Sequence, residues 1–193
     1  MPDNSRLRLA VIVGSQHDDR IGPPPARWLA EQARRHASLE IEVIDLAEAA
    51  LPAAPAGDEP LPSRVRAMAA SLAAADAFVV VAEELHGEVP VSLKSAIAWF
   101  QDEWKAKPIT FVSCGCPTAG RDASEQVRHM FTEVYAVALR HSINLPRDWR
   151  EISGYSPPKT STGPHASVKA VLEPLIWWAR ALREARSARP CEV

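Results

Sequence analysis

The sequence is short of cysteine and of excess charge, and it has no long hydrophobic run. Its three cysteines form no Cys-x-x-Cys pair, and the formal net charge at pH 7 is only -2. This charge balance leaves no basic surface to drive nucleic-acid binding. No apolar stretch approaches the length that a bilayer requires, and residues 1–6 run into a first strand without a signal peptide. We therefore expect a cytoplasmic protein with reduced thiols, no membrane anchor and no nucleic-acid partner.

Apolar segments alternate with amphipathic ones along the chain. With 193 residues, of which 47% are hydrophobic, the chain suffices for one domain with a sizeable core, which we place at residues 1–193. The expected strands are Leu7–Val13, Leu39–Asp45, Asp76–Val81, Ile109–Val112 and a short Ile143–Leu145. The expected helices are Pro24–His36, Ser63–Ala74, Val91–Gln101, Ala123–Arg140 and Ala166–Arg189. The order predicts an α/β fold with a doubly wound, five-stranded parallel sheet, in which the alternating second segment is an edge strand.

Two strand orders fit this alternation, the Rossmann order and the flavodoxin-like order 2-1-3-4-5. The Rossmann order requires Gly-x-Gly-x-x-Gly directly after the first strand, whereas here Gly14 is followed by Ser15 and a polar loop that reaches Arg20. A hydroxyl, an arginine and the N–H groups and positive dipole at a helix start near Gly22 can together hold a phosphate monoester. This loop favours the flavodoxin-like order, with a mononucleotide such as FMN across the ends of the first, third and fourth strands. An ordinary strand-to-helix turn is the alternative.

Three separated segments carry a resemblance to a known family. They are Val13-Gly14-Ser15 with Arg20, Gly22-Pro23 and Ala26-Arg27-Trp28; Val89-Pro90 with Leu93-Lys94, Ala96-Ile97 and Trp99; and Lys107-Pro108 with Phe111-Val112-Ser113 and Gly115. From about Leu7 to Leu145 the chain resembles the NADPH-dependent FMN reductase family of flavodoxin-like proteins. The resemblance implies tightly bound FMN, hydride uptake from NADPH or NADH, a small-molecule electron acceptor, and assembly as a homodimer or a dimer of dimers.

The loops that are expected to contact the flavin depart from the family pattern. The family's Gly-Ser-Thr-Arg is Gly14-Ser15-Gln16-His17 here, its Pro-Glu-Tyr-Asn is Glu83-Glu84-Leu85-His86, and its Ser-Tyr-Gly-Gly is Ser113-Cys114-Gly115-Cys116. The resemblance nevertheless implies an FMN site in these three loops. Its expected members are Ser15, His17, Arg20, Gly22, Pro23, Glu84, Leu85, His86, Ser113, Cys114 and Gly115. Main-chain N–H groups in the second and third loops can orient the flavin whatever their side chains are.

Several side chains in these loops have two interpretations. His86 is the candidate catalytic residue, because an imidazole titrates near neutral pH, and a loop histidine without a role is the alternative. Glu83 and Glu84 form either a general acid–base pair or, as we prefer, solvated loop carboxylates. Cys114 and Cys116 fit small turn residues better than a redox or zinc site, because no second cysteine pair completes a metal shell.

Two further features have less specific interpretations. His17 beside two aspartates fits a surface loop better than a metal site, so that no metal is expected. Trp99 and Phe100 are adjacent on the helix expected at Val91–Gln101 and should point to different sides, which predicts that one side meets a partner subunit. Trp177-Trp178 is expected in the core or in the same kind of interface.

Three hypotheses about function follow. The first is an FMN-dependent NAD(P)H oxidoreductase that reduces free flavin, a quinone or another small acceptor by ping-pong hydride transfer. The second is a flavoenzyme of a biosynthetic pathway, with the altered loops forming the pocket for a dedicated substrate. The third is a flavodoxin-like binding or electron-carrier protein; carriers are usually strongly acidic monomers, and the net charge of -2 argues mildly against this class.

Overall fold

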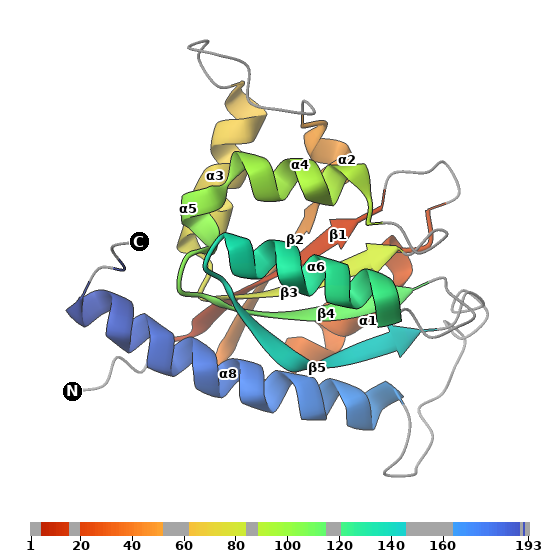
Figure 1. Cartoon of the computed structure of the whole chain (residues 1–193). Coiled ribbons are helices and arrows are strands. Elements are labelled where there is room, and N and C mark those ends of the chain that lie inside the picture. Colours follow the sequence, from red (N-terminus) through yellow and green to blue (C-terminus); the bar gives the residue numbers. More distant parts are fainter. Residues whose placement is uncertain are drawn as a thin grey trace.

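Five parallel strands form one sheet between two layers of helices (Figure 1). The computed structural model describes residues 5–15, 20–51, 62–83, 89–114, 121–145, 164–189 and 191. The strands are β1 (Leu7–Gly14), β2 (Leu39–Asp45), β3 (Ala77–Glu83), β4 (Pro108–Cys114) and β5 (Val137–Leu145). The helices are α1 (Pro23–Ala33), α2 (Leu46–Ala49), α3 (Ser63–Ala74), α4 (Val91–Trp99), α5 (Gln101–Trp104), α6 (Arg121–Glu133) and α8 (Pro164–Ala188).

The order of the strands is β2-β1-β3-β4-β5, which confirms the flavodoxin-like prediction. Every residue of β3 and β4 is buried, because helices cover both faces of these central strands. Burial in β2 is interrupted by exposed positions, and this strand lies at the edge of the sheet as its alternating sequence predicted. None of the helices in the described part of the chain is long and apolar enough to cross a membrane.

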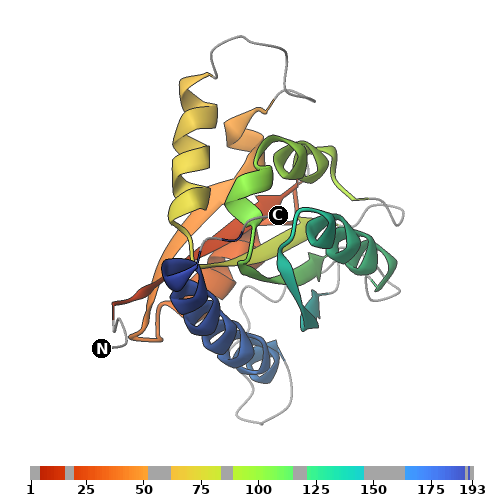
Figure 2. The same cartoon turned by 60° about the vertical axis from the view of Figure 1, so that its left-hand side comes forward.

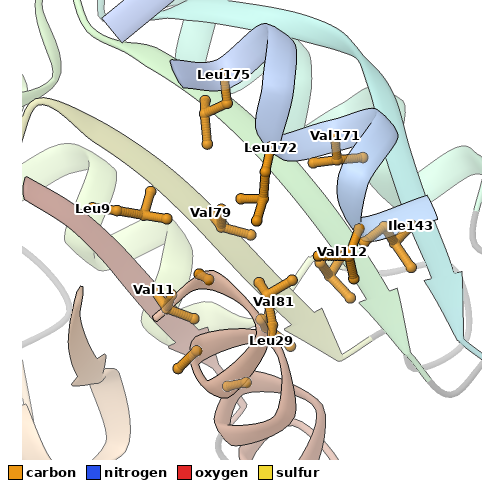
Figure 3. Packing of buried hydrophobic residues seen from close by; sticks show 14 of the residues in the cluster. Leu9, Val11, Leu29, Val79, Val81, Val112, Ile143, Val171, Leu172 and Leu175 are labelled. Atoms are coloured by element: carbon orange, nitrogen blue, oxygen red, sulfur yellow. The ribbon is translucent and has the colours of Figure 1, made fainter. Parts of the chain in front are cut away.

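The sheet separates two hydrophobic clusters. On one face, alternate residues of the strands pack against α1 and α8, as the cluster around Leu29, Val81 and Leu172 shows (Figure 3). On the other face they pack against α3, α4, α5 and α6, which lie across the sheet from α8 (Figure 2). Trp104 is fully buried in this second cluster, with its ring edge-on to Phe78 at 4.8 Å and to Phe131 at 5.1 Å between centroids. Successive residues of a strand therefore pack into different hydrophobic clusters.

The prediction of one long helix over Ala123–Arg140 is wrong, because α6 ends at Glu133 and β5 begins at Val137. Tyr135 adopts a left-handed backbone conformation, with φ of 59°. Its N–H bonds to the Thr132 carbonyl at 3.0 Å, and the following N–H bonds to the carbonyl five residues earlier, also at 3.0 Å. This is the Schellman arrangement that usually has glycine at the left-handed position. A tyrosine there gives no signal in the sequence that the helix ends.

The strand β5 is longer than expected and contains an irregularity. Between its pairs with Ile109 and Phe111, one residue of β4, Thr110, faces three residues of β5. The Thr110 hydroxyl donates to the His141 carbonyl at 2.6 Å, and the Arg128 guanidinium of α6 donates to the Leu139 carbonyl. These side chains satisfy carbonyls that the regular ladder leaves unpaired.

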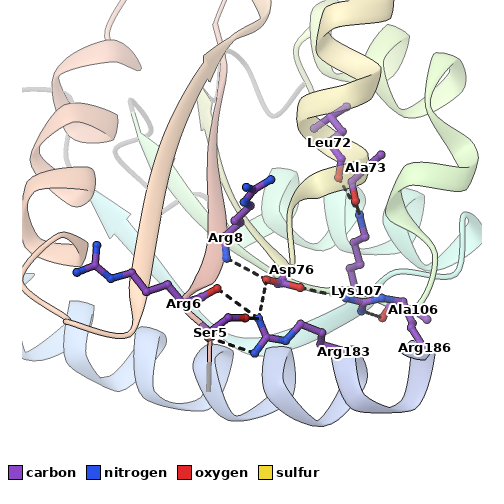
Figure 4. Close-up of polar contacts among 10 residues, drawn as sticks. All are labelled: Ser5, Arg6, Arg8, Leu72, Ala73, Asp76, Ala106, Lys107, Arg183 and Arg186. Carbon is purple, nitrogen blue, oxygen red and sulfur yellow. Dashed lines mark hydrogen bonds and ion pairs between the residues drawn. The ribbon is translucent and has the colours of Figure 1, made fainter. Parts of the chain in front are cut away.

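At the amino ends of the strands, Asp76 connects α8 to the sheet through hydrogen bonds and ion pairs (Figure 4). Its carboxylate accepts from the Arg8 main-chain N–H at 2.9 Å, and its main-chain N–H donates to the Arg8 carbonyl at 2.8 Å. Arg183 and Arg186 of α8 both lie 3.5 Å from the same carboxylate. This charged group therefore has a structural role at the end of the sheet opposite to the carboxyl ends of the strands.

Candidate functional site

The carboxyl ends of β1, β3 and β4 bring a hydroxyl, a carboxylate and a thiol to one face of the sheet. Ser15 follows β1, while Glu83 and Cys114 end their strands as register partners. The Ser15 hydroxyl donates to the Glu83 carboxylate at 2.6 Å, and both side chains are buried, with Ser15 at 0% and Glu83 at 6% exposure. All three follow the alternation that directs Val13, Val81 and Val112 toward α1 and α8.

The start of α1 packs closely against this group. A Cβ atom on Gly22 would lie 3.0 Å from the Ser15 Cβ and 3.3 Å from a methyl group of Val13, so a larger residue here would have to displace these side chains by a few tenths of an ångström. The expectation that the helix start offers unpaired N–H groups to a phosphate is wrong at its first three positions. They are prolines, Pro23 to Pro25, which have no N–H, and the Ala26 N–H already bonds to the Gly22 carbonyl at 3.2 Å. The helix contributes its dipole but few direct donors.

Arg20 links the loop after β1 to the end of β2. Its Nε donates to the Ser15 carbonyl at 3.1 Å, and its guanidinium forms an ion pair with Asp45. The Asp45 carboxylate also accepts from the Ala47 main-chain N–H at 3.0 Å and so caps α2. The charge of Arg20 is therefore shared with a carboxylate, which the sequence analysis missed.

The end of β4 directs its two side chains to opposite faces. The Ser113 hydroxyl donates to the Asn144 amide oxygen of β5 at 2.7 Å. Cys114 is 1% exposed, and its thiol lies 3.6 Å from the Ala82 carbonyl. Burial, together with the charge of Glu83, raises the pKa of the Cys114 thiol to about 12. Cys114 is therefore a protonated thiol within the core, and only its main chain is suited to hold a cofactor.

The structure brings together only part of the expected site. Ser15, Arg20, Gly22 and Pro23 lie around the loop after β1, and Ser113 and Cys114 end β4. The remaining expected members lie outside the described residues; they are His17, Glu84, Leu85, His86 and Gly115. Cys116 lies outside them as well.

Sequence reasoning misjudged Glu83. It was expected on a loop and in solvent, whereas it is the last residue of β3 and is buried. A signal for this position was available in the sequence. The strand Ala77–Glu83 is covered on both faces, and such a strand is buried through to its last residue, which is Glu83. Asp45 had a similar signal, since it ends the strand beside β1 and a carboxylate there can reach an arginine in the neighbouring loop.

Residues 7–150 match the sequence profile described as NADPH-dependent FMN reductase. The chain belongs to the NADPH-dependent FMN reductase family. An NAD(P)H-dependent FMN reductase of Schizosaccharomyces pombe is 31% identical over 153 residues, which cover 73% of this chain and 74% of that protein. Another, from Saccharomyces cerevisiae, is 28% identical over 125 residues, covering 56% of this chain and 65% of that one.

Solved structures show the same fold at low sequence identity. The flavoenzyme NAD(P)H:acceptor oxidoreductase FerB of Paracoccus denitrificans superposes with a TM-score of 0.60 at 19% identity, over 91% of this chain and 94% of that one. An NADH:FMN oxidoreductase, EMOB, in its apo form, superposes with a TM-score of 0.66 at 12% identity, over 91% of this chain and 89% of that one. As a member of its family, the chain is an NAD(P)H-dependent flavin reductase with FMN as cofactor.

The described residues fit FMN in two respects and oppose its phosphate in one. The strand ends of β1, β3 and β4 meet where the strand order reverses, which is where a flavodoxin-like sheet binds its ligand. Gly22 lets the start of α1 come close to Ser15, and Arg20 supplies a cation. The feature that does not suit a phosphate is that carboxylates already occupy both side chains: Glu83 accepts from the Ser15 hydroxyl, and Asp45 pairs with Arg20.

Proposed function

We propose that this reductase transfers electrons from NAD(P)H to a small acceptor, such as free flavin or a quinone, in two alternating half-reactions. The observation that carries the proposal is the polar group at the ends of β1, β3 and β4 in a chain whose residues 7–150 match the FMN reductase profile. Bound FMN supplies the hydride chemistry that joins the two half-reactions. The chain's own residues bind and orient the two ligands in turn.

We assign the phosphate end of the site to the loop after β1. Ser15 and Arg20 supply the side chains there, with Gly22 and Pro23 at the start of α1 and His17 within the same loop. In this assignment the cation Arg20 neutralises part of the phosphate charge, and charge-assisted hydrogen bonds of this kind are about twice as strong as neutral ones.

We assign the flavin ring to the carboxyl ends of β3 and β4 and the segments that follow them in the sequence. Main-chain N–H groups of Glu84, Leu85 and His86 on one side, and of Ser113 to Gly115 on the other, can stabilise negative charge at the ring carbonyls. His86 is the proposed proton donor, because its imidazole can carry a proton near neutral pH. No metal ion takes part in this scheme.

Rapid-mixing experiments test the assignment. Protein loaded with FMN is mixed anaerobically with NADPH and, separately, with NADH, and the flavin absorbance is followed. Fast bleaching with at least one donor, followed by return of the absorbance on mixing with menadione or free FMN, is the expected result. Bleaching that requires a further substrate supports the dedicated biosynthetic enzyme instead. No bleaching with either donor over minutes contradicts the general reductase and leaves the dedicated enzyme or the non-catalytic flavin-binding protein.

We also propose that the protein forms a homodimer, although α4 does not supply the argument expected from it. Phe100 is buried and Trp99 packs against the same hydrophobic cluster, so neither side chain is directed away from the core toward a partner subunit. The outer face of α8 offers a better surface. Trp177 is 63% and Trp178 is 38% exposed there, with their rings edge-to-face at 5.2 Å. Tryptophan is enriched in protein interfaces, where its burial contributes strongly to affinity.

The charges beside Trp177 favour a second copy of this chain as the partner. Two α8 helices packed antiparallel about a two-fold axis between Ile176 and Trp177 bring Glu173 opposite Arg180 of the partner subunit. The same arrangement brings Lys169 opposite Glu184 of the partner subunit. All four positions are exposed and lie on the same side of the helix as Trp177. Opposite charges at both contacts make this face of α8 complementary to itself, as a two-fold interface requires.

A further inference from the structure

Glu83 is in direct competition with any ligand for the hydroxyl of Ser15. The hydroxyl donates to the Glu83 carboxylate at 2.6 Å, within the usual range for such bonds, and neither side chain is open to solvent. A serine hydroxyl has a single proton and can donate to one acceptor only. Ser15 must leave Glu83 before it can donate to a phosphate oxygen.

The charges around this pair do not favour a dianion either. Arg20 is the cation that bonds to the Ser15 main chain, and it is already in an ion pair with Asp45. Cys114 faces Glu83 from β4 as a neutral thiol, because its pKa is raised to about 12. A phosphate within hydrogen-bonding distance of the Ser15 hydroxyl therefore meets the Glu83 carboxylate, and the arginine bonded to the Ser15 main chain is already paired with Asp45.

We propose that Glu83 is a specificity-determining residue that weakens the binding of the terminal phosphate of FMN by holding the Ser15 hydroxyl. This inference rests on the proposed function, in which Ser15 belongs to the phosphate end of the site. FMN is then bound mainly through its flavin and ribityl parts, and it exchanges with free flavin instead of remaining tightly bound. Riboflavin, which lacks the phosphate, binds the wild-type protein with an affinity within about tenfold of that of FMN.

Flavin titrations of the apoprotein, followed by calorimetry or fluorescence quenching, test this inference. In Glu83→Gln the side chain keeps its shape and loses its charge, and its amide can donate to the phosphate. We expect this variant to bind FMN about tenfold or more tightly than wild type and to bind riboflavin as wild type does, since a hydrogen bond to a charged group contributes about this much.

Glu42→Gln is the matched control. Glu42 also accepts a serine hydroxyl, that of Ser71 at 2.7 Å, but it is exposed in the middle of β2. This variant should leave both flavin affinities unchanged. Adding Ser15→Ala to Glu83→Gln should remove the part of the gain in FMN affinity that the Ser15 hydroxyl contributes and leave riboflavin binding as it was.

The outcomes separate this inference from the proposed function. If wild type binds both flavins and Glu83→Gln leaves the ratio of their affinities unchanged, Glu83 does not oppose the phosphate and the inference is overturned. Should Glu83→Gln fail to fold, the wild-type protein alone provides the test. If wild type binds FMN more than a hundredfold more tightly than riboflavin, the inference is overturned. If wild type binds neither flavin, the proposed function itself fails.

Discussion

The guanidinium of Arg20 and the carboxylate of Asp45 form an ion pair that joins the loop after β1 to the end of β2. Both side chains are largely buried, at 23% and 16% exposure. The same Asp45 oxygen accepts the Ala47 N–H and so caps α2. Asp45 therefore holds Arg20 in place and at the same time offsets the positive charge that a phosphate would use.

Asp45→Asn separates these two effects, because asparagine keeps the cap on α2 but carries no charge. We expect FMN to bind several-fold more tightly to this variant, since the carboxylate no longer competes for Arg20. Arg20→Ala should act in the opposite direction and weaken FMN binding by up to about tenfold, which is the most that the phosphate contributes in wild type. Calorimetric titration with FMN measures both changes. If Asp45→Asn weakens binding as Arg20→Ala does, the main role of Asp45 is to position the arginine.

Alkylation distinguishes Cys114 from Cys191. Burial raises the pKa of Cys114 to about 12, so that almost none of it is thiolate at pH 8, and the thiolate is the reactive form. Cys191 is exposed. We expect iodoacetamide to label Cys191 in the native protein within minutes and to label Cys114 only after unfolding. Peptide mass spectrometry at pH 8, with and without urea, measures the labelling of each site. Rapid native labelling at Cys114 would contradict the buried position at the end of β4.

The left-handed backbone at Tyr135, which follows the end of α6, has a cost that substitutions can measure. Tyr135 is 53% exposed and adopts φ of 59°, a conformation that L-residues adopt at a cost of roughly 1 kcal/mol and that glycine adopts freely. Tyr135→Gly should therefore raise the free energy of unfolding by about 0.5–1 kcal/mol, measured by urea denaturation. Tyr135→Ala is the control, because alanine has the same backbone restriction as tyrosine and should bring no such gain.

The fold could be predicted from the sequence where hydrophobic pattern alone decides it. The unbroken runs of β1, β3 and β4 identified the central strands, and the alternation of β2 identified the edge. The boundary between α6 and β5 could not be predicted, because Tyr135 stands where glycine usually ends a helix. Three residues of β5 also face Thr110 alone, which disturbs the alternation that would mark a strand.

The site could be predicted only as a set of loops. Ser15, Arg20 and Gly22 follow β1 as expected, since a loop after a buried strand must lie at the carboxyl end of the sheet. Their partners could not be predicted, because Glu83 and Asp45 reach them from other strands. Contacts of this kind depend on strand order and on which face each side chain takes, and a motif does not contain that information.

The exposed tryptophans of α8 make the proposed dimer testable. We expect light scattering to give the mass of a dimer at micromolar concentration, and Trp177→Glu to convert it to a monomer with unchanged circular dichroism. Val91→Glu is the control, because Val91 is 60% exposed on α4, the helix that the sequence had suggested as the interface. A monomeric Val91→Glu together with a dimeric Trp177→Glu would place the interface on α4. A wild-type monomer would contradict dimerisation through either helix.

Lys107 makes the stability of the fold depend on pH. Its ammonium group is buried between α3 and the sheet, where Nζ donates to the carbonyls of Leu72 at 2.7 Å and Ala73 at 2.8 Å (Figure 4). Burial, together with the charge of Arg186 and against the opposing charge of Asp76, lowers the pKa of Lys107 from 10.5 to about 8. A neutral amine still has two N–H donors, one for each carbonyl.

The direction of the pH dependence follows from this lowered pKa. Between about pH 8 and 10.5 the unfolded chain holds a proton on Lys107 that the folded chain has released, so stability rises with pH in this window. Relative to Lys107→Met, wild type should gain about 2 kcal/mol of unfolding free energy between pH 7 and 9.5, by urea denaturation at each pH. Lys105→Met is the matched control, because a hydrogen bond to Asp102 raises the pKa of Lys105. The difference in unfolding free energy between wild type and this variant should not increase from pH 7 to 9.5. If the difference between wild type and Lys107→Met stays constant from pH 7 to 9.5, Lys107 titrates as an ordinary lysine, and its burial does not affect stability through its charge.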